Sequence, residues 1–272
     1  MSKIIPPRWP NADISAEDTQ PMYRVMEVMR KVPEVTVFFW IVKLLTTAMG
    51  ESTSDYLVYQ INPYVAVILG GIGLVIALIL QFAVRRYIPW IYWLAVLMVA
   101  IFGTMAADVM HIVLGVPYLT STIFFAVVLA IIFVIWYMTE KTLSIHSITT
   151  RRRELFYWAT VMATFALGTA AGDMTAATLH LGYFASAILF AVLIALPALG
   201  YFLFKLNPIV AFWFAYIVTR PLGASIADWL GKPYLGGLGL GDGIVSFVLL
   251  LLIIAFVGYL TVSHRDAKGE RG

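Results

Sequence analysis

Eight long apolar segments separated by short polar breaks follow a polar N-terminal stretch. Each segment is close to the roughly 20 residues that a helix needs to cross a bilayer. The breaks at residues 61–63, 115–118 and 181–182 are so short that consecutive helices must turn back as antiparallel hairpins. The pattern therefore predicts an all-α integral membrane protein with eight transmembrane helices, at residues 36–60, 64–84, 89–114, 119–139, 155–180, 183–204, 208–230 and 243–262.

A 16-residue frame recurs four times at identical spacing. It consists of a Trp, a Gly ten positions later and an Asp five positions after the Gly. The first helix of each predicted hairpin carries the frame, so the repeating unit is a two-helix hairpin. Because each unit crosses the membrane twice, the four units are parallel repeats with expected pseudo-symmetry about an axis near the membrane normal. The copies are Trp40–Asp55, Trp93–Asp108, Trp158–Asp173 and Trp213–Asp228.

The repeats define the predicted domain organisation. Residues 1–34 are expected to form a cytoplasmic N-terminal segment, with a short interfacial helix at residues 22–31. Residues 35–264 form the transmembrane domain and residues 265–272 a cytoplasmic tail. Small residues surround each frame Gly, so the four frame helices are expected to cluster centrally, shielded by the other four. The four repeats are expected at about residues 36–84, 89–139, 155–204 and 208–262.

Composition and charge support a membrane protein and orient it. Of the residues, 61% are hydrophobic and 12% charged, whereas a soluble domain has about 25% charged residues. Fifteen of the 18 Lys and Arg residues fall on the side that holds both termini, and only Lys232 falls in an opposite loop. Both termini are therefore expected in the cytoplasm. The absence of Cys excludes disulfides, thiolate metal sites and a Cys nucleophile.

The frame Asp residues are the main candidate site. Their common position predicts four carboxylates at one depth in the outer half of the membrane, with Glu51 one turn before the first of them. A lone charge at mid-bilayer costs about 2.5–3.5 kcal/mol, and acids there usually mark ion or proton paths. We therefore expect a cation site formed by Asp55, Asp108, Asp173 and Asp228, assisted by Glu51 and His111.

The identity of the cation depends on the ligand types. His111 follows Asp108 by three positions, which places both on one helix face. Oxygen ligands together with imidazole suit a divalent metal such as Mn²⁺, whereas oxygens alone would suit Mg²⁺ or Ca²⁺. The expected metal ligands are Asp55, Asp108, His111, Asp173 and Asp228.

Two basic residues within the spans are candidate counter-ions. Lys43 and Arg220 each precede an acid by eight residues, and Arg220 is expected to pair with a frame Asp. The four frame Asp residues and Glu51 carry a formal charge of −5 against +2 from these two bases. Bound protons or a bound cation must balance the difference in a medium of low dielectric constant.

Several residues also have purely structural interpretations. The Trp residues are expected as interfacial anchors, and the frame Gly residues as close-packing positions, with a local helix break as the alternative. His111 and His180 have an alternative role as residues at the outer helix ends. Asp242 is expected to cap the last helix. The frame Asp residues have the alternative role of tying helices together.

Trp40, Trp93, Trp158 and Trp213, with the Gly–Asp pair after each, give the chain a recognisable signature. Four tandem repeats of two membrane segments with a recurring Trp resemble a bacterial membrane-protein family described as a repeat of unknown function, whose members are called uncharacterised membrane-anchored proteins. The resemblance covers about residues 36–262. It implies a multi-pass protein of the bacterial inner (plasma) membrane, and it implies no activity.

The sequence favours a secondary transporter or carrier of a small cation, with a divalent metal such as Mn²⁺ as the leading substrate and protons as a candidate exchange partner. The alternative is a non-transporting scaffold or sensor. An enzyme is not expected because the chain has no HExxH or GxSxG motif. The expected partners are the lipid bilayer and the cation, with no cofactor and no nucleic acid; self-association into a homo-oligomer stays open.

Overall fold

The computed structural model describes residues 30–266, and this part of the chain is helical, without strands. Two π-helical turns extend α4 and α6, at Val109–Val113 and Met174–Thr178, and a 3₁₀ turn lies at Ile145–Ser147. The interfacial helix expected at residues 22–31 falls almost wholly outside the described residues. The long helices are α2 Val37–Gln60, α3 Pro63–Ala83, α4 Pro89–Asp108, α5 Tyr118–Glu140, α6 Arg151–Asp173, α7 Gly182–Phe204, α8 Pro208–Gly231 and α9 Asp242–Ser263.

The helix ends follow local capping chemistry. Asn62 and Asn207 each accept a hydrogen bond from a backbone N–H of the following first turn, and each precedes a Pro at the first helical position. α6 starts four residues before its predicted span because Thr150 caps it. The capping role expected of Asp242 is wrong: Gly241, with φ 89°, precedes α9, and Asp242 is its first residue.

Seven of the long helices are apolar and long enough to cross a membrane by length and composition. The eighth, α2, has 24 residues but carries Lys43, Glu51 and Asp55. These polar residues are buried among the other helices. The faces of α3, α7 and α9 that point outward expose large apolar side chains along their length, as expected for a surface in contact with lipid. The chain is a multi-pass membrane protein.

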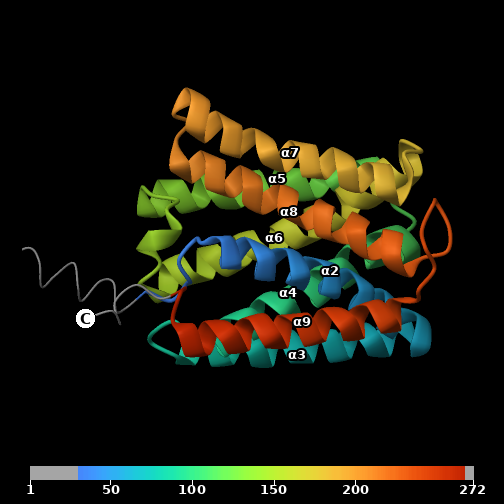
Figure 1. Cartoon of the computed structure of the whole chain (residues 1–272), viewed down its shortest axis with the longest axis horizontal. Coiled ribbons are helices and arrows are strands. Elements are labelled where there is room, and N and C mark those ends of the chain that lie inside the picture. The colour runs from blue at the N-terminus through green and yellow to red at the C-terminus, as the bar shows by residue number, and fades with distance from the viewer. Residues whose placement is uncertain (1–29, 267–272) are drawn as a thin grey trace, which may run out of the picture.

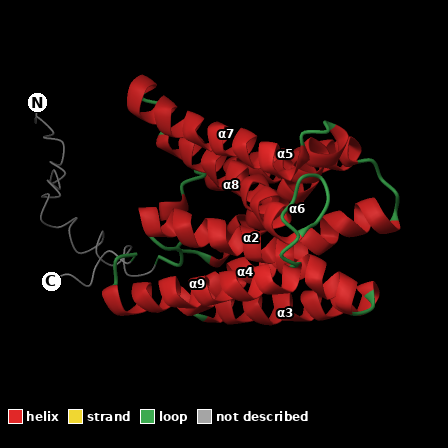
Figure 2. Ribbon diagram, turned by 45° about the vertical axis from the view of Figure 1, so that its right-hand side comes forward, coloured by secondary structure: helices red, strands yellow, loops and turns green. Residues whose placement is uncertain are grey.

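The four frame helices form a closed ring at the centre of the molecule. α2 packs against α4 and α8, and α6 packs against the same two helices. The remaining helices lie outside: α3 packs on α4, α5 on α6, α7 on α8 and α9 on α2. Accordingly, α3 and α9 lie on one side of the ring, with α5 and α7 on the opposite side (Figures 1 and 2). Each outer helix thus covers the frame helix of the next hairpin, and the last returns to the first.

The frame glycines allow the ring helices to approach closely. A Cβ atom at any of them would overlap a residue of the next frame helix, seven positions after the Trp of that helix. The Gly of the fourth copy contacts the first frame helix in the same way. The α-helix continues through all four positions, so the packing interpretation is confirmed and a helix break is excluded. The contacts are Gly50 with Ala100, Gly103 with Phe165, Gly168 with Arg220 and Gly223 with Thr47.

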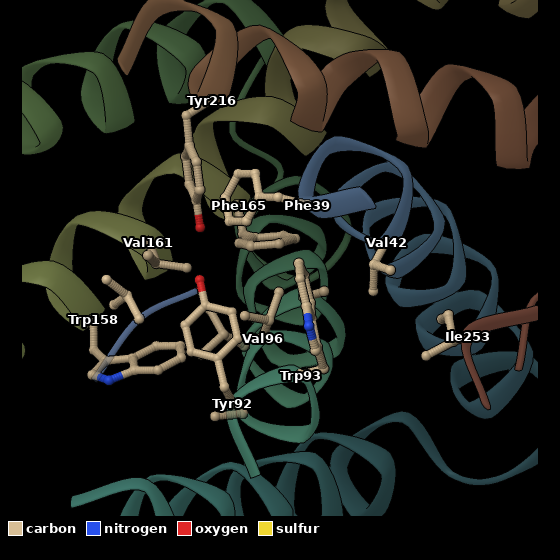
Figure 3. Packing of buried hydrophobic residues seen from close by; sticks show 14 of the residues in the cluster. Phe39, Val42, Tyr92, Trp93, Val96, Trp158, Val161, Phe165, Tyr216 and Ile253 are labelled. Atoms are coloured by element: carbon tan, nitrogen blue, oxygen red, sulfur yellow. The ribbon is translucent and has the colours of Figure 1, made fainter. Parts of the chain in front are cut away.

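The Trp residues are not the interfacial anchors that the sequence suggested. Trp93, Trp158 and Trp213 are only 2–4% exposed and belong to the main buried cluster. Figure 3 shows Trp93 and Trp158 among other buried side chains of this cluster. The reason is the ring itself, because outer helices surround the frame helices and fill the space where lipid was expected. Trp40 is only partly buried and packs against the same cluster.

The end of the ring that carries the Trp residues, here called the Trp end, is closed by a buried polar network. Lys31 pairs with Glu154 of α6, and the same carboxylate accepts a hydrogen bond from Gln81 Nε2 of α3 at 3.0 Å. All three side chains are buried. The segments before α2 and after α9 also meet here, since Glu34 N donates to the carbonyl of Asp266 at 2.9 Å.

Candidate functional site

The lining of the ring comes from positions spaced by four residues, beginning one residue before each Trp. Residues four apart share one face of a helix, and side chains from different helices meet at several of these levels. All are buried except Phe212, Asp108 and Asp173, which are partly buried. The sets are Phe39, Lys43, Thr47, Glu51 and Asp55 on α2; Tyr92, Val96, Ala100, Thr104 and Asp108 on α4; Tyr157, Val161, Phe165, Thr169 and Asp173 on α6; and Phe212, Tyr216, Arg220, Ala224 and Asp228 on α8.

The centre of the ring is held by Arg220. Its Nη2 donates to Glu51 Oε2 at 2.7 Å, to Thr169 Oγ1 at 2.6 Å and to Thr104 Oγ1. The two hydroxyls in turn donate to Glu51 Oε2, at 3.2 Å from Thr104 and 3.3 Å from Thr169. Four helices therefore meet at one buried cation. The sequence predicted a frame Asp as the partner of Arg220; its partner is Glu51.

The Asp end of the ring, opposite the Trp end, holds the acidic cluster. Oxygens of Glu51, Asp55 and Asp228 all lie within 4.8 Å of one another. Lys232 lies between two of them, with its Nζ 2.9 Å from Asp55 Oδ2 and 2.8 Å from Asp228 Oδ1. Burial acts to lower the pKa of Lys232, yet the neighbouring carboxylates of Asp228 and Asp55 raise it well above its usual value. The ammonium group thus holds the place of a cation between two carboxylates.

Asp108 and Asp173 lie at the same level as this cluster but differ from it. Both are partly exposed, and within residues 30–266 neither side chain has a hydrogen-bonding or ion-pairing partner. Each is followed directly by a π-helical turn. Such turns leave the regular hydrogen-bond ladder and are frequent at functional sites. These two carboxylates are the less buried acids of the Asp end.

The histidines do not join the carboxylates. The ring nitrogens of His111 contact the carbonyl oxygen of Val116 at 3.1 Å and the hydroxyl of Ser121 at 3.3 Å, within its own hairpin turn. His180 is exposed, with a positive φ of 55°, in the turn before α7. Of the expected metal ligands, the structure therefore brings together Asp55 and Asp228, joined by Glu51, and leaves His111 apart from them.

Lys43 occupies an unusual position. Its side chain is fully buried, and its Nζ has no hydrogen-bond acceptor in the described part of the chain. The amine lies 3.8 Å from the ring centroid of Tyr216 and 4.5 Å from that of Phe165, an arrangement that favours a cation through the aromatic faces. Lys43 is thus not the direct counter-ion of a carboxylate that its spacing suggested.

Three participants were missed from the sequence. Lys232 was taken as an ordinary loop residue, although it follows Asp228 by four positions, the spacing at which side chains meet on a helix. Thr104 and Thr169 were passed over because they carry no charge. Their signal was their register, since both stand one residue after the frame Gly, as Glu51 does in the first copy.

The ligand set suits a hard cation. It consists of carboxylates and hydroxyls, the donors that Mg²⁺, Ca²⁺ and Mn²⁺ accept. Four acids can present oxygens at the Asp end: the buried Asp55 and Asp228 and the partly buried Asp108 and Asp173. Glu51 reaches from this cluster to the Arg220 level. Carboxylate and hydroxyl oxygens in this arrangement are suited to binding a small cation.

Comparison with known proteins gives a family and no activity. The family model described as Repeat of Unknown Function (DUF347) matches the chain four times, at residues 38–87, 91–142, 156–207 and 211–266. Each match contains one frame helix and the outer helix that follows it. No curated protein and no solved structure matches the chain.

Proposed function

Because the chain belongs to this family of repeats, which carries no known activity, we propose a function from the site alone: the protein is a carrier of a small cation. The leading substrate is a divalent metal such as Mn²⁺, exchanged for protons. The observation that carries the proposal is the pair Asp108 and Asp173, two partly exposed carboxylates without partners beside the cluster of Glu51, Asp55 and Asp228.

Charge balance supports this reading. When ionised, the five acids carry a formal −5, while Lys43, Arg220 and Lys232 supply at most +3, so at least two negative charges need compensation at the Asp end of a membrane protein. Unpaired charge in a medium of low dielectric constant is costly and is relieved by protons or a bound cation. One divalent cation, or two protons, would neutralise the set, and this equivalence is what an exchanger requires.

The donor atoms bear on which metal is carried. The imidazole that favoured Mn²⁺ in the sequence lies in a hairpin turn, so the remaining ligands are all oxygens. Mn²⁺ shares this preference with Mg²⁺ and Ca²⁺. Mn²⁺ therefore stays in the proposed class on its hardness alone, and the three metals belong together in the first binding measurements.

We further propose that the four hairpins are related by pseudo-symmetry about an axis near the membrane normal, with both termini in the cytoplasm of a bacterial inner membrane. The closed cycle of glycine contacts and of outer-helix packing supports the symmetry. The distribution of Lys and Arg supports the orientation. The Asp end then opens to the outside, and the Trp end faces the cytoplasm.

A scaffold or sensor is the competing function, and one observation favours it. Arg220, Glu51, Thr104 and Thr169 join four helices through one network, as acids that only tie helices together would. Asp108 and Asp173 separate the two functions, because they tie nothing together. A scaffold loses little when they are neutralised, whereas a carrier loses its cation.

Asp108→Asn and Asp173→Asn test the proposal. Glu140→Gln, at the C-terminal end of α5 and away from the Asp end, is the control for removing an acid. Mn²⁺, Mg²⁺ and Ca²⁺ binding would be measured by calorimetry on purified protein, and Mn²⁺ uptake in proteoliposomes under an imposed pH gradient. We expect each Asp variant to fold and to lose at least ten-fold in binding and uptake, with the control unchanged. Folded Asn variants that bind and transport normally would overturn the carrier function and leave the scaffold.

A further inference from the structure

The level of the ring that holds Arg220 has the form of an occupied cation site. Three of the four frame helices contribute an oxygen from the same register, one residue after the frame Gly: Glu51, Thr104 and Thr169. The fourth helix has Ala224 there and supplies the cation from one turn earlier. All three oxygens converge on the single atom Nη2 of Arg220. Convergence of several oxygens on one point is the arrangement that coordinates a small ion.

The guanidinium group fits this shell poorly. Each terminal nitrogen of the guanidinium group carries two hydrogens, yet three oxygens surround Nη2. The other two nitrogens, Nε and Nη1, are buried without a partner in the described chain. Arginine normally uses its fork of donors in parallel pairs, and a buried donor without an acceptor is destabilising. The oxygens are thus arranged around one atom rather than around a planar guanidinium.

Glu51 connects this level to the buried carboxylates of the Asp end. It belongs to the cluster with Asp55 and Asp228 and also accepts from Arg220 at 2.7 Å. On the opposite side, Phe165 and Tyr216 separate Arg220 from the Trp end, with Lys43 against both rings. A cation that enters from the Asp end and reaches Glu51 therefore meets Arg220 next, and aromatic side chains beyond it.

We propose that Glu51, Thr104 and Thr169 form an inner site for a small monovalent cation, and that Arg220 occupies it as a tethered plug that keeps the ring closed to ions. One carboxylate with two hydroxyls balances a single positive charge, which favours Na⁺ or ammonium over a divalent metal. The plugging role rests on the proposed carrier function. The site itself rests only on the three converging oxygens and the incompletely partnered guanidinium.

Arg220→Ala removes the plug and places at this position the residue that the second repeat has there, Ala100. The variant would be purified and titrated with Na⁺, ammonium and guanidinium at millimolar concentrations while its unfolding temperature is followed. We expect saturable stabilisation of the variant by several degrees and none of the wild type. Thr104→Val or Thr169→Val in the Arg220→Ala background should weaken the response about ten-fold, and Glu51→Gln should abolish it.

Arg220→Ala also leaves Glu51 buried without its partner, which disfavours folding. The variant would therefore also be expressed and purified with and without millimolar ammonium or guanidinium, far below the molar guanidinium concentrations that unfold proteins. The inner site predicts that either cation restores the yield of folded protein in Arg220→Ala. It also predicts no such effect in the double variant Glu51→Gln/Arg220→Ala. Restoration that is equal in both, or absent from Arg220→Ala, would overturn the inner site.

The plug is tested in proteoliposomes. Arg220→Ala, reconstituted with its cation present, should give a Na⁺ leak that wild-type protein lacks and that Thr104→Val reduces. A variant that binds Na⁺ saturably but stays tight to ions would overturn the plug and leave the site in place. Failure of metal transport in the wild type would overturn the carrier function and the plugging role that rests on it. The inner site would remain, because the binding titrations require no transport.

Discussion

Two lysines of this protein show how much partners decide the role of a buried cation. Lys232 lies between the carboxylates of Asp55 and Asp228, whereas Lys43 lies against the rings of Tyr216 and Phe165 and has no acceptor in the described chain. The first is an ammonium held between two carboxylates that the proposed cation would also use. The second contacts aromatic rings and, in the described chain, no carboxylate. Only the first should compete with a bound cation.

Lys232→Met should therefore increase metal affinity while weakening the metal-free protein. Removing the ammonium frees oxygens of Asp55 and Asp228 and leaves two like charges close together. We expect a lower unfolding temperature without metal, and at least ten-fold tighter Mn²⁺ binding by calorimetry. Lys205→Met, which removes an exposed charge at the end of α7, is the control. Equal Mn²⁺ affinity in wild type and Lys232→Met would contradict the competition.

Asp266 gives a residue-scale prediction on pH. Its carboxylate is buried and accepts a hydrogen bond from Tyr87 OH at 2.5 Å. Burial raises the pKa of Asp266, and the Tyr87 hydrogen bond opposes this only in part. A carboxyl group with a raised folded pKa contributes stability below its unfolded pKa of about 3.9, and this contribution is lost as pH rises through the folded pKa.

Asp266→Asn removes that titration and keeps an oxygen for Tyr87. We expect the unfolding temperature of the wild type to fall relative to Asp266→Asn as pH rises from about 4 toward 8, in thermal melts at pH 4.5, 6 and 8. Tyr87→Phe, which removes the opposing hydrogen bond, should widen the difference. Parallel wild-type and Asp266→Asn stability profiles across this range would show that Asp266 titrates normally.

At the scale of the element, the helices follow from simple patterns whereas their contacts do not. Apolar runs of span length, with Asn-Pro starts, predicted every long helix to within a few residues. The Trp positions misled because a residue's depth along a helix does not reveal whether lipid or another helix lies beside it. The prediction of His111 as a metal ligand rested on its spacing from Asp108. That spacing does not reveal that the ring nitrogens have closer partners in the hairpin turn.

The candidate site was predictable only where charge marked it. The acids, Lys43 and Arg220 stand out in an apolar run, and the sequence named all of them. Their pairing was not predictable, because which of five acids meets Arg220 depends on how the helices rotate within the ring. Thr104 and Thr169 carried no signal beyond their register. Lys232 looked like a loop residue because it follows the end of its helix, and the structure also places it directly after α8.

The frame glycines give a prediction at this scale. A Cβ at Gly50 would overlap Ala100 and lie 2.9 Å from its carbonyl carbon, so backbone must shift. Gly50→Ala should destabilise the protein by about 1–3 kcal/mol. Gly258→Ala in α9 is the matched control, since its nearest neighbour, Trp90 Cζ2, is 3.9 Å away. That change should be neutral or stabilising by about 0.5–1 kcal/mol. Thermal melts that rank the two variants the other way would refute close packing as the role of Gly50.

For the whole molecule, the orientation in the membrane is directly testable because the chain contains no Cys. Tyr234→Cys lies in the loop after α8, and Lys205→Cys lies between α7 and α8; both positions are exposed. In intact cells, a membrane-impermeant maleimide should label Tyr234→Cys, and it should label Lys205→Cys only after the cells are opened. The reverse pattern would place the carboxylates toward the cytoplasm and invert the proposed direction of entry.

The backbone hydrogen bond from Glu34 to Asp266 brings the two ends of the helical part of the chain together, so the ring of hairpins closes without a gap. Each hairpin packs against the next and the last packs against the first, so the fold does not require the chain to start at one particular hairpin. A circularly permuted chain should fold and keep the cation binding that is measured for the wild type. In it, residues 30 and 266 are joined by a short linker, so that Lys31 keeps its pair with Glu154, and new termini are opened between Lys141 and Thr142. Its insertion into membranes would show that the order of the hairpins around the ring, rather than the order of their synthesis, specifies the fold.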